Sequence, residues 1–152
     1  MNIKSDLVEV HVFKIVNNEL QFLLLKRSSH KIYPGLWQMV SGHIKKGESA
    51  VKTALRELKE ETGLKPQHFW VAPNINSFYF PGDDSITLIP VFAAQVDDHD
   101  VNISDEHSEF KWVNSEEAKK HLAWEGQRKS VDIIKEYFTN QKSFLNFTEI
   151  PL

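Results

Sequence analysis

Three glutamates in one short stretch are the residues of this chain best suited to do chemistry. Glu57, Glu60 and Glu61 stand at positions i, i+3 and i+4, so a helix places all three on one face. Like charges at this spacing repel each other, and a divalent cation such as Mg²⁺, which prefers oxygen ligands, would remove that repulsion. The spacing therefore predicts a metal site, and a metal site of this kind usually faces phosphate groups.

These glutamates belong to a longer pattern that runs from Gly42 to Leu64. Its fixed positions are Gly42, Glu48, Arg56, Glu57, Glu60, Glu61 and Gly63, with apolar residues at Leu58 and Leu64. In this pattern the chain resembles the Nudix hydrolases, and nine constrained positions over 23 residues argue against a chance match. The resemblance implies an enzyme that uses Mg²⁺ or Mn²⁺ to cleave a nucleoside diphosphate linked to another group.

The resemblance also implies roles for single residues of the pattern. Gly42 matches the position whose backbone carbonyl reaches the metal, and Glu48 matches a glutamate that supports the site. Arg56 matches an arginine that pairs with a glutamate and fixes its orientation, a control that tunes a metal as much as ligand identity does. The plainer interpretations are a solvated helix face for the glutamates, a surface ion pair for Arg56 and a turn glycine for Gly42.

The general base is less fixed, because members of the family take it either from this pattern or from a later loop. The later loop here covers residues 104–109. Glu106 is our preferred further metal ligand or base, because it precedes His107 as in some triphosphate-cleaving members. Asp105 and Glu109 are its rivals, and a loop that is merely polar is the alternative interpretation.

Substrate-binding residues are expected on both sides of the pattern. Arg27 matches a family position that often contacts substrate phosphate. Trp37, Tyr79 and Phe80 offer aromatic rings for stacking on a base, although packing within the core is the commoner role of such rings. We expect residues 78–81 to be a loop that precedes a strand.

The elements that position these residues follow from local patterns. Residues 8–13 alternate in polarity and residues 20–27 form a buried run, so both are predicted strands, joined at Asn17 and Asn18 as a hairpin. A helix is expected after the N-cap Ser49, ending at Gly63. We expect its apolar stripe to pack on a sheet while its glutamates point elsewhere; the stripe is Ala50, Val51, Ala54, Leu55 and Leu58.

The rest of the chain continues the alternation of strands and helices. Further strands are expected over 37–40, 85–96 and 109–113, and further helices over 115–122 and 130–138. Pro90 weakens the second of these strands as a central strand, or marks an edge or bulge. The apolar tail at 144–147 should fold back on the domain or pack on a partner. We therefore predict one α/β domain over residues 1–152, with the Nudix fold: an α/β/α sandwich with a mixed sheet and a catalytic loop-helix-loop.

Composition narrows the class of protein. The chain has 152 residues, a net charge of −3 and no cysteine, which excludes disulfides and thiolate chemistry. It lacks a basic block for a nucleic-acid polymer, an apolar run that would span a membrane, and a start like that of a signal peptide. We expect a cytoplasmic protein whose partner is a small nucleotide-like molecule, and, by analogy with the family, a homodimer as a further assembly.

The substrate is predicted from resemblance alone. The pattern and the later loop look most like bacterial pyrophosphohydrolases of dATP and dihydroneopterin triphosphate, which release a monophosphate and pyrophosphate. ADP-ribose and other sugar diphosphates rank second, because Pro81 is displaced from the position of a proline in those members. Dinucleoside polyphosphates rank third, because Pro81 and Gly82 stand where those members tend to have a tyrosine.

Two other classes of protein share the fold. An inactive binding module is disfavoured because the predicted metal-binding glutamates are all intact. An isomerase of isoprenoid diphosphates would require a cysteine, which this chain lacks.

Overall fold

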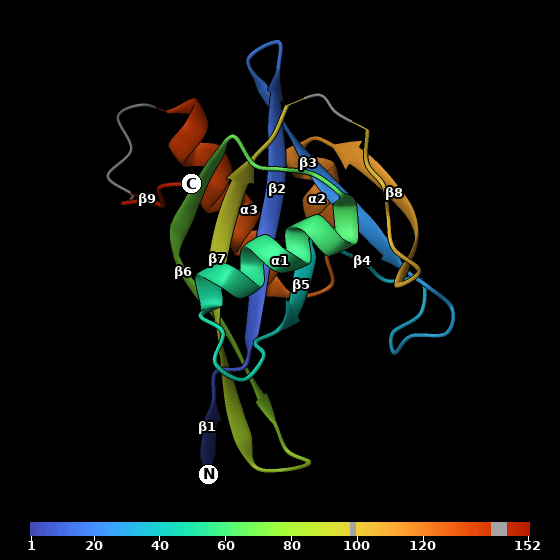
Figure 1. Cartoon of the computed structure of the whole chain (residues 1–152), viewed down its shortest axis with the longest axis vertical. Helices are drawn as coiled ribbons and strands as arrows, with labels where there is room; N and C mark the ends of the chain where they lie inside the picture. The colour runs from blue at the N-terminus through green and yellow to red at the C-terminus, as the bar shows by residue number, and fades with distance from the viewer. Residues whose placement is uncertain (98–99, 141–145) are drawn as a thin grey trace.

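The computed structural model describes residues 1–97, 100–140 and 146–152. Within this part of the chain a mixed sheet runs through the molecule, with helices on both of its faces (Figure 1). The strands are β1 (Asn2–Lys4), β2 (Leu7–Val16), β3 (Glu19–Arg27), β4 (Trp37–Gln38), β5 (Val40–His43), β6 (His68–Phe80), β7 (Ser85–Gln95), β8 (His107–Val113) and β9 (Thr148–Glu149). The helices are α1 (Ala50–Thr62), α2 (Ser115–His121) and α3 (Glu125–Thr139).

The main path of the sheet has the order β4-β3-β2-β7-β6-β9. β2 and β7 run parallel, whereas β2 with β3 and β6 with β7 run antiparallel. Three strands lie off this path: β1 pairs with β7, β5 with β2, and β8 with β3. The predicted mixed sheet is therefore confirmed.

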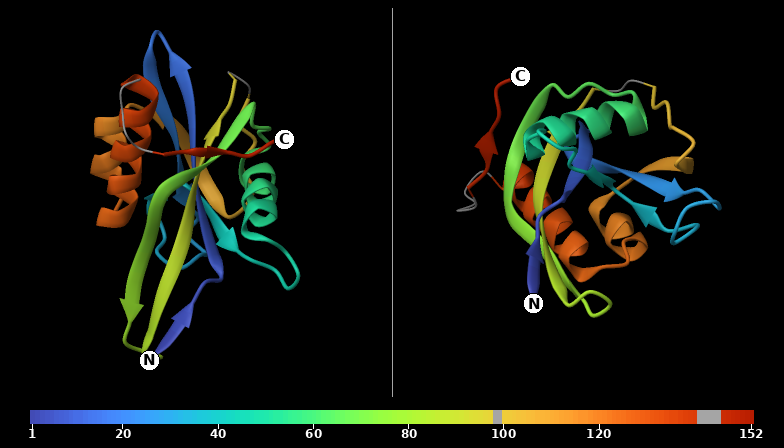
Figure 2. Two further views of the ribbon diagram at one scale, coloured as in Figure 1. Left: turned by 90° about the vertical axis from the view of Figure 1, so that its left-hand side faces the viewer. Right: turned by 60° about the horizontal axis from the view of Figure 1, so that its bottom comes forward.

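Alternation along β2 divides the core into two layers. Val8, Val10 and Val12 pack in one cluster with Leu58 of α1, and Phe13 packs in the other with Val131 of α3. α1 consequently covers one face of the sheet, while α2 and α3 cover the opposite face (Figure 2). This is the α/β/α sandwich that the sequence predicts.

The hairpin between β2 and β3 is confirmed by its turn. Asn17 and Asn18 have φ values of 52° and 64°, the positive values that a two-residue type I′ turn requires at both central positions. Asparagine tolerates this left-handed region better than most residues, so two consecutive asparagines suit the turn. The turn sets the register that places Phe13 opposite Phe22.

α1 begins and ends where its capping residues stand. The Ser49 side chain accepts a hydrogen bond from the Lys52 backbone N–H at 3.2 Å. At the other end Gly63 has a φ of 71°, and its N–H donates to the Lys59 carbonyl at 2.8 Å. These caps fix the length of the helix that carries the glutamates.

The antiparallel partner of β2 changes along its length. Residues 7–10 of β2 pair with β5, but residues 13–16 pair with β3. β3 therefore diverges from β5, and its far end pairs with β4 on one side and β8 on the other. The start of β5 lies at this divergence, because Val40 pairs with Val10, and α1 lies in front of β5 (Figure 1).

The largest error of the sequence prediction concerns β6. Residues 78–80, expected in a loop, belong to this long strand, which pairs with β7 to form an arm that projects from the body beside β1 (Figures 1 and 2). Pro90 lies in the central strand β7 but pairs with Ile75, directly after the register of β6 shifts, so its interpretation as a bulge marker is confirmed. α3 begins at Glu125, five residues before the predicted start.

The apolar tail folds back on the domain where the structure describes it. Phe147 is buried and stacks on Tyr137, with ring centroids 4.1 Å apart, and β9 then pairs with β6. The other two apolar residues of the predicted tail, Phe144 and Leu145, lie outside the described residues.

Replacing Gly63 tests how much the cap of α1 contributes. Gly63→Ala should lower the free energy of unfolding by about 1–2 kcal/mol, because a side chain is disfavoured at positive φ, and its Cβ would lie 3.3 Å from the Asn102 Cβ. Gly47→Ala is the matched control: Gly47 also has a positive φ, of 79°, but open space around it. It therefore reports the cost of a side chain at positive φ without the close contact with Asn102. Urea denaturation measures both, and an unchanged midpoint for Gly63→Ala would contradict the proposed role of the cap.

Candidate active site

The three glutamates of α1 lie in different environments. Glu61 is 1% exposed, whereas the side chain of Glu60 is 54% exposed and that of Glu57 is mostly covered. Glu61 is buried because it follows Ala54 and Leu58 at i+7 and i+3, on the stripe that packs against the sheet. The expectation that all the glutamates point away from the packed face is therefore wrong for Glu61.

Glu61 meets two residues of the later loop and β8. Carboxylate oxygens of Glu61 and Glu106 and a ring nitrogen of His107 all lie within 4.8 Å of one another. Neither carboxylate oxygen of Glu61 has a hydrogen-bond partner in the described part of the chain. Burial, and then the neighbouring carboxylates of Glu57 and Glu106, raise the pKa of Glu61 to about 10.

His107 is neutral in this setting. Burial, followed by the positive charges of Arg27 and Lys31, lowers the pKa of its imidazole to about 4. One ring nitrogen, Nε2, lies 3.0 Å from the Gln38 side-chain amide and 3.7 Å from a Glu61 oxygen. The other nitrogen, Nδ1, has no partner among the described residues.

A divalent cation fits these donors. Oxygen atoms of two carboxylates and one neutral imidazole are ligand types that divalent metals accept. Two buried carboxylate oxygens without donors are costly unless a positive charge joins them. Glu61 is thus placed to hold a metal, with Glu106 and His107 beside it.

Arg56 organises the remaining acidic residues of the pattern. Its guanidinium donates to both oxygens of Glu48, at 2.8 and 2.9 Å, and to Glu57 and Glu60 at 2.7 and 3.2 Å. A further bond reaches the His43 carbonyl at 3.1 Å. One arginine thereby fixes two of the glutamates on α1 and ties them to the end of β5.

Glu48 is held in its charged form by this arrangement. Hydrogen bonds from Arg56, and then from the Thr53 hydroxyl at 2.6 Å, lower the pKa of Glu48 to about 2. The same pairing raises the pKa of Arg56 above its ordinary value.

Gly42 lies in β5 rather than in a turn. A Cβ atom at Gly42 would lie 2.3 Å from the carboxyl carbon of Glu57, so only glycine leaves room for that carboxylate beside the strand. The turn-glycine interpretation is therefore excluded. The backbone of β5 approaches the predicted metal ligands closely.

The rivals of Glu106 are engaged differently. Glu109 forms an ion pair with Lys26 at 2.9 Å. The backbone carbonyls of Asp105 and Glu106 accept hydrogen bonds from the side chain and the backbone of Ser28. Among the three acidic residues of this loop, Glu106 is the one that joins Glu61 and His107.

Arg27 and the predicted aromatic residues are spread over the fold. Arg27 donates to the Ile32 carbonyl at 2.6 Å and carries a charge that acts on His107. Trp37 has Lys111 above its ring at 4.3 Å and the edge of His121 beside it. Tyr79 and Phe80 lie on the arm, which projects away from α1 (Figure 1), so the structure does not bring them together with Glu61.

The sequence pattern indicated His107 only as the neighbour of Glu106, and it did not single out Gln38. The position of His107 directly after Glu106 was the available signal for its place in the site, because neighbouring residues can contribute donor atoms to the same metal-binding cluster. Gln38 gave no signal, because only a non-local contact with His107 brings it near the site.

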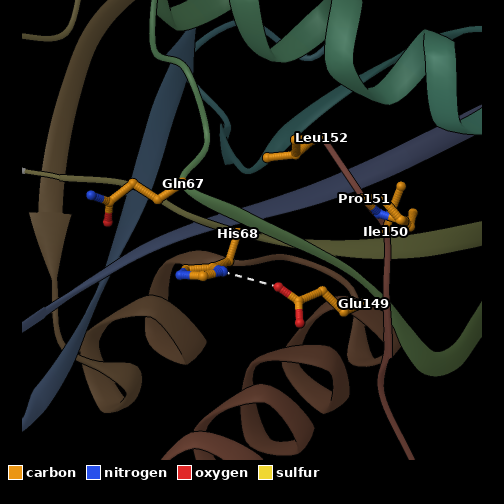
Figure 3. A pocket seen from close by; sticks show the side chains of 6 residues that line it. All are labelled: Gln67, His68, Glu149, Ile150, Pro151 and Leu152. Carbon is orange, nitrogen blue, oxygen red and sulfur yellow. Dashed lines mark hydrogen bonds and ion pairs between the residues drawn. The ribbon is translucent and has the colours of Figure 1, made fainter.

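A surface pocket lies elsewhere, where the C-terminal segment crosses β6 (Figure 3). Its lining residues are Gln67, His68, Glu149, Ile150, Pro151 and Leu152. His68 and Glu149 pair across it at 2.9 Å, which satisfies its main polar groups. It contains no residue of the glutamate pattern, so we do not regard it as the reaction site.

Comparison with known proteins agrees with this geometry. The model of the NUDIX domain matches residues 6–133, which include the whole glutamate pattern and the Glu106 loop. The chain belongs to the NUDIX family. It is thus a Nudix hydrolase, an enzyme that acts on nucleotide-like substrates.

The curated relatives differ in how much of their own length this chain matches. The asymmetrical bis(5'-nucleosyl)-tetraphosphatase of Rattus norvegicus is 32% identical over 108 residues, which cover 69% of this chain and 71% of that protein. An octanoyltransferase of Myxococcus xanthus is 32% identical over 132 residues, which cover 82% of this chain. That protein is much longer, and the match spans only 35% of it.

The fold has a similar counterpart among solved structures. A crystal structure of a NUDIX hydrolase from Listeria monocytogenes superposes with a TM-score of 0.77 at 24% identity, covering 90% of this chain and 95% of that one. Among the described residues, no helix is long and apolar enough to span a membrane.

The Glu48–Arg56 pair predicts a pH-dependent stability. The folded-state pKa of Glu48 lies below its ordinary value of 4.5, so its stabilisation is present above about pH 4.5 and is lost as the pH falls toward 2. Glu48→Gln should therefore lower the melting temperature at pH 7 but not at pH 2, as measured by circular dichroism. The control Glu117→Gln removes only an exposed pair with Lys120, and an equal loss for Glu48→Gln at both pH values would contradict the assignment.

Proposed function

We propose that this Nudix hydrolase uses Mg²⁺, with Mn²⁺ as an alternative, to cleave a phosphoanhydride bond in a nucleoside triphosphate-like substrate. Its products are a monophosphate and pyrophosphate. The observation that carries the proposal is the buried carboxylate of Glu61, which lacks a hydrogen-bond partner in the described structure and lies beside Glu106 and His107.

The proposed metal ligands come from two parts of the fold. Glu57, Glu60 and Glu61 contribute from α1, Glu106 from the later loop, and Gly42 through its backbone carbonyl. The carboxylate–imidazole cluster and the close approach of Gly42 to Glu57 support this set. When bound, such a metal neutralises phosphoryl oxygens and lowers the pKa of a water molecule.

The chain's own residues complete the proposed mechanism. Arg56 orients Glu57 and Glu60 through its hydrogen bonds, and Glu48 holds Arg56 in place. Glu106 serves as a further ligand or as the base that accepts a proton from water, since it is less buried than Glu61 and His107. Arg27, with Lys31 nearby, binds the negatively charged phosphates.

The substrate class is proposed in an order of preference. A triphosphate such as dATP or dihydroneopterin triphosphate ranks first, from the resemblance of the pattern and the EHSEFKWV stretch. A dinucleoside polyphosphate is the second candidate, because the relative from Rattus norvegicus carries the name of a tetraphosphatase. ADP-ribose and other sugar diphosphates rank third, because Pro81 is displaced from the position of the proline in the members that cleave such substrates.

Other features of the proposal extend beyond the site. We propose a single domain over residues 1–152, a cytoplasmic location and a homodimer, all of which stay predictions from the sequence. Trp37, Tyr79 and Phe80 likewise stay predicted substrate-binding residues. Of these, Trp37 lies next to Arg27 in the fold, because it pairs with Lys26 of β3.

A substrate panel tests the proposed reaction. Purified protein with Mg²⁺, with Mn²⁺ or with EDTA is incubated with dNTPs, NTPs, dihydroneopterin triphosphate, ADP-ribose and a diadenosine tetraphosphate, and the products are resolved by chromatography. Metal-dependent release of monophosphate and pyrophosphate from a triphosphate is the expected result. Turnover in EDTA would refute the metal assignment, and turnover of ADP-ribose alone would refute the substrate class.

Single carboxamide variants test the proposed roles. Glu60→Gln and Glu106→Gln should each lower kcat about 100-fold or more, because each loses an anionic ligand or base at nearly constant shape. Glu109→Gln, which loses only the ion pair with Lys26, is the matched control and should keep near-native turnover. If Glu109→Gln were the inactive variant and Glu106→Gln the active one, Glu106 would be the wrong residue.

A further inference from the structure

Two exposed aromatic rings form a pair outside the residues used so far. Tyr33, in the loop between β3 and β4, is 60% exposed, and Trp124, the residue before α3, is 43% exposed. Their ring centroids lie 5.7 Å apart with planes at 78°, an edge-on contact. In such a contact the edge of one ring meets a face of the other, and the exposed fractions show that both rings still present apolar surface to solvent.

The backbone of Tyr33 is held in an unfavourable conformation. Its φ of 52° lies in the left-handed region, where a bulky side chain is a marked outlier. Backbone hydrogen bonds maintain this conformation: the Leu36 N–H donates to the Tyr33 carbonyl at 3.2 Å, and the Gly35 N–H donates to the Arg27 carbonyl at 3.0 Å. Strain that keeps a large ring exposed, rather than buried, is typical of functional positions.

The loop that carries Tyr33 is joined directly to the proposed metal site. The Ser28 backbone donates to the Glu106 carbonyl at 2.9 Å, and the Ser28 hydroxyl donates to the Asp105 carbonyl at 2.8 Å. The charges of Arg27 and Lys31 both act on the buried ring of His107. Along the chain, the cations Arg27 and Lys31 and the contact residue Ser28 thus precede the exposed ring of Tyr33.

This order matches the parts of one kind of ligand. A nucleotide-like substrate has a polyphosphate, which metals and cations bind, and a flat heterocycle, which stacks on aromatic faces. Trp37 lies near the same loop, but Lys111 already covers its ring at 4.3 Å. The rings of Tyr33 and Trp124 are therefore more open to solvent than the ring of Trp37.

We propose that Tyr33 and Trp124 form the binding site for the heterocyclic ring of the substrate. The inference rests on the proposed function, since it assumes a heterocycle carried on a polyphosphate. The site determines affinity for the ring and does not take part in bond cleavage.

Kinetics with two substrates test this inference. In Tyr33→Ala and Trp124→Ala the KM for dATP should rise about 5- to 100-fold, the range expected for the loss of one stacked ring, with kcat within about twofold of wild type. Hydrolysis of inorganic tripolyphosphate, which has no heterocycle, should be unchanged. Tyr33→Phe and Trp124→Phe, which keep a ring, should retain most of the affinity for dATP.

The strained backbone provides a variant that separates binding from folding. Tyr33→Gly removes the ring and also suits the positive φ, so it should melt at or above the wild-type temperature while its KM for dATP rises. Phe110→Ala, which removes an exposed ring on β8, is the matched control and should leave the KM unchanged. If Tyr33→Gly lowered the melting temperature and impaired both substrates equally, the pair would be a structural contact and the proposal would fail.

A binding measurement distinguishes failure of this inference from failure of the proposed function. Calorimetry with dATP or tripolyphosphate in the presence of Ca²⁺ reports affinity without requiring turnover. Weaker binding of dATP alone in Tyr33→Ala would support the site even if dATP is not hydrolysed. Equal affinity of the wild type for dATP and tripolyphosphate would refute it, whatever the enzyme hydrolyses.

Discussion

The burial of the Glu61 carboxylate is the constraint on which the rest of the structure depends. Glu61 lies on the stripe of α1 that packs against the sheet, and neither of its oxygens has a hydrogen-bond partner among the described residues. Burying an ionised carboxylate that has no hydrogen-bond donor lowers the stability of the folded state by roughly several kcal/mol, unless a positive charge lies next to it. Arg56 does not provide that charge, because its donors are directed to Glu48, Glu57 and Glu60.

The surroundings of Glu61 divide the work of the site between rigid and exposed parts. Arg56 and Glu48 hold two glutamates of α1 in place, and Gly42 leaves room for one of them beside β5. The strained loop around Tyr33 is exposed and Glu106 is only half-buried, and the backbone of Ser28 in this loop donates a hydrogen bond to the Glu106 carbonyl. A metal-bound polyphosphate would therefore be held by the rigid part, while the exposed part meets the variable end of the substrate.

The features predicted correctly are those that local chemistry determines. Ser49 and Gly63 bound α1, and Asn17 and Asn18 form the hairpin turn, because caps and turns depend on a few neighbouring residues. β6 was missed because Pro73 and Asn74 interrupt its pattern, although only the short turn at residues 81–84 separates it from β7. The burial of Glu61 was missed for a related reason: the i, i+3, i+4 spacing does not say which side of a helix the sheet covers.

Thermal melting of wild type and Glu61→Gln, in EDTA and in Mn²⁺, tests most directly whether Glu61 is kept buried for a metal. In EDTA the variant should melt at or above the wild-type temperature, because it removes a buried carboxylate. With Mn²⁺ at about 100 times its Kd, the wild type should gain about 2.7 kcal/mol, a rise of roughly 5–10 °C, and the variant should gain far less. A variant that melts lower in EDTA but responds fully to Mn²⁺ would contradict the account.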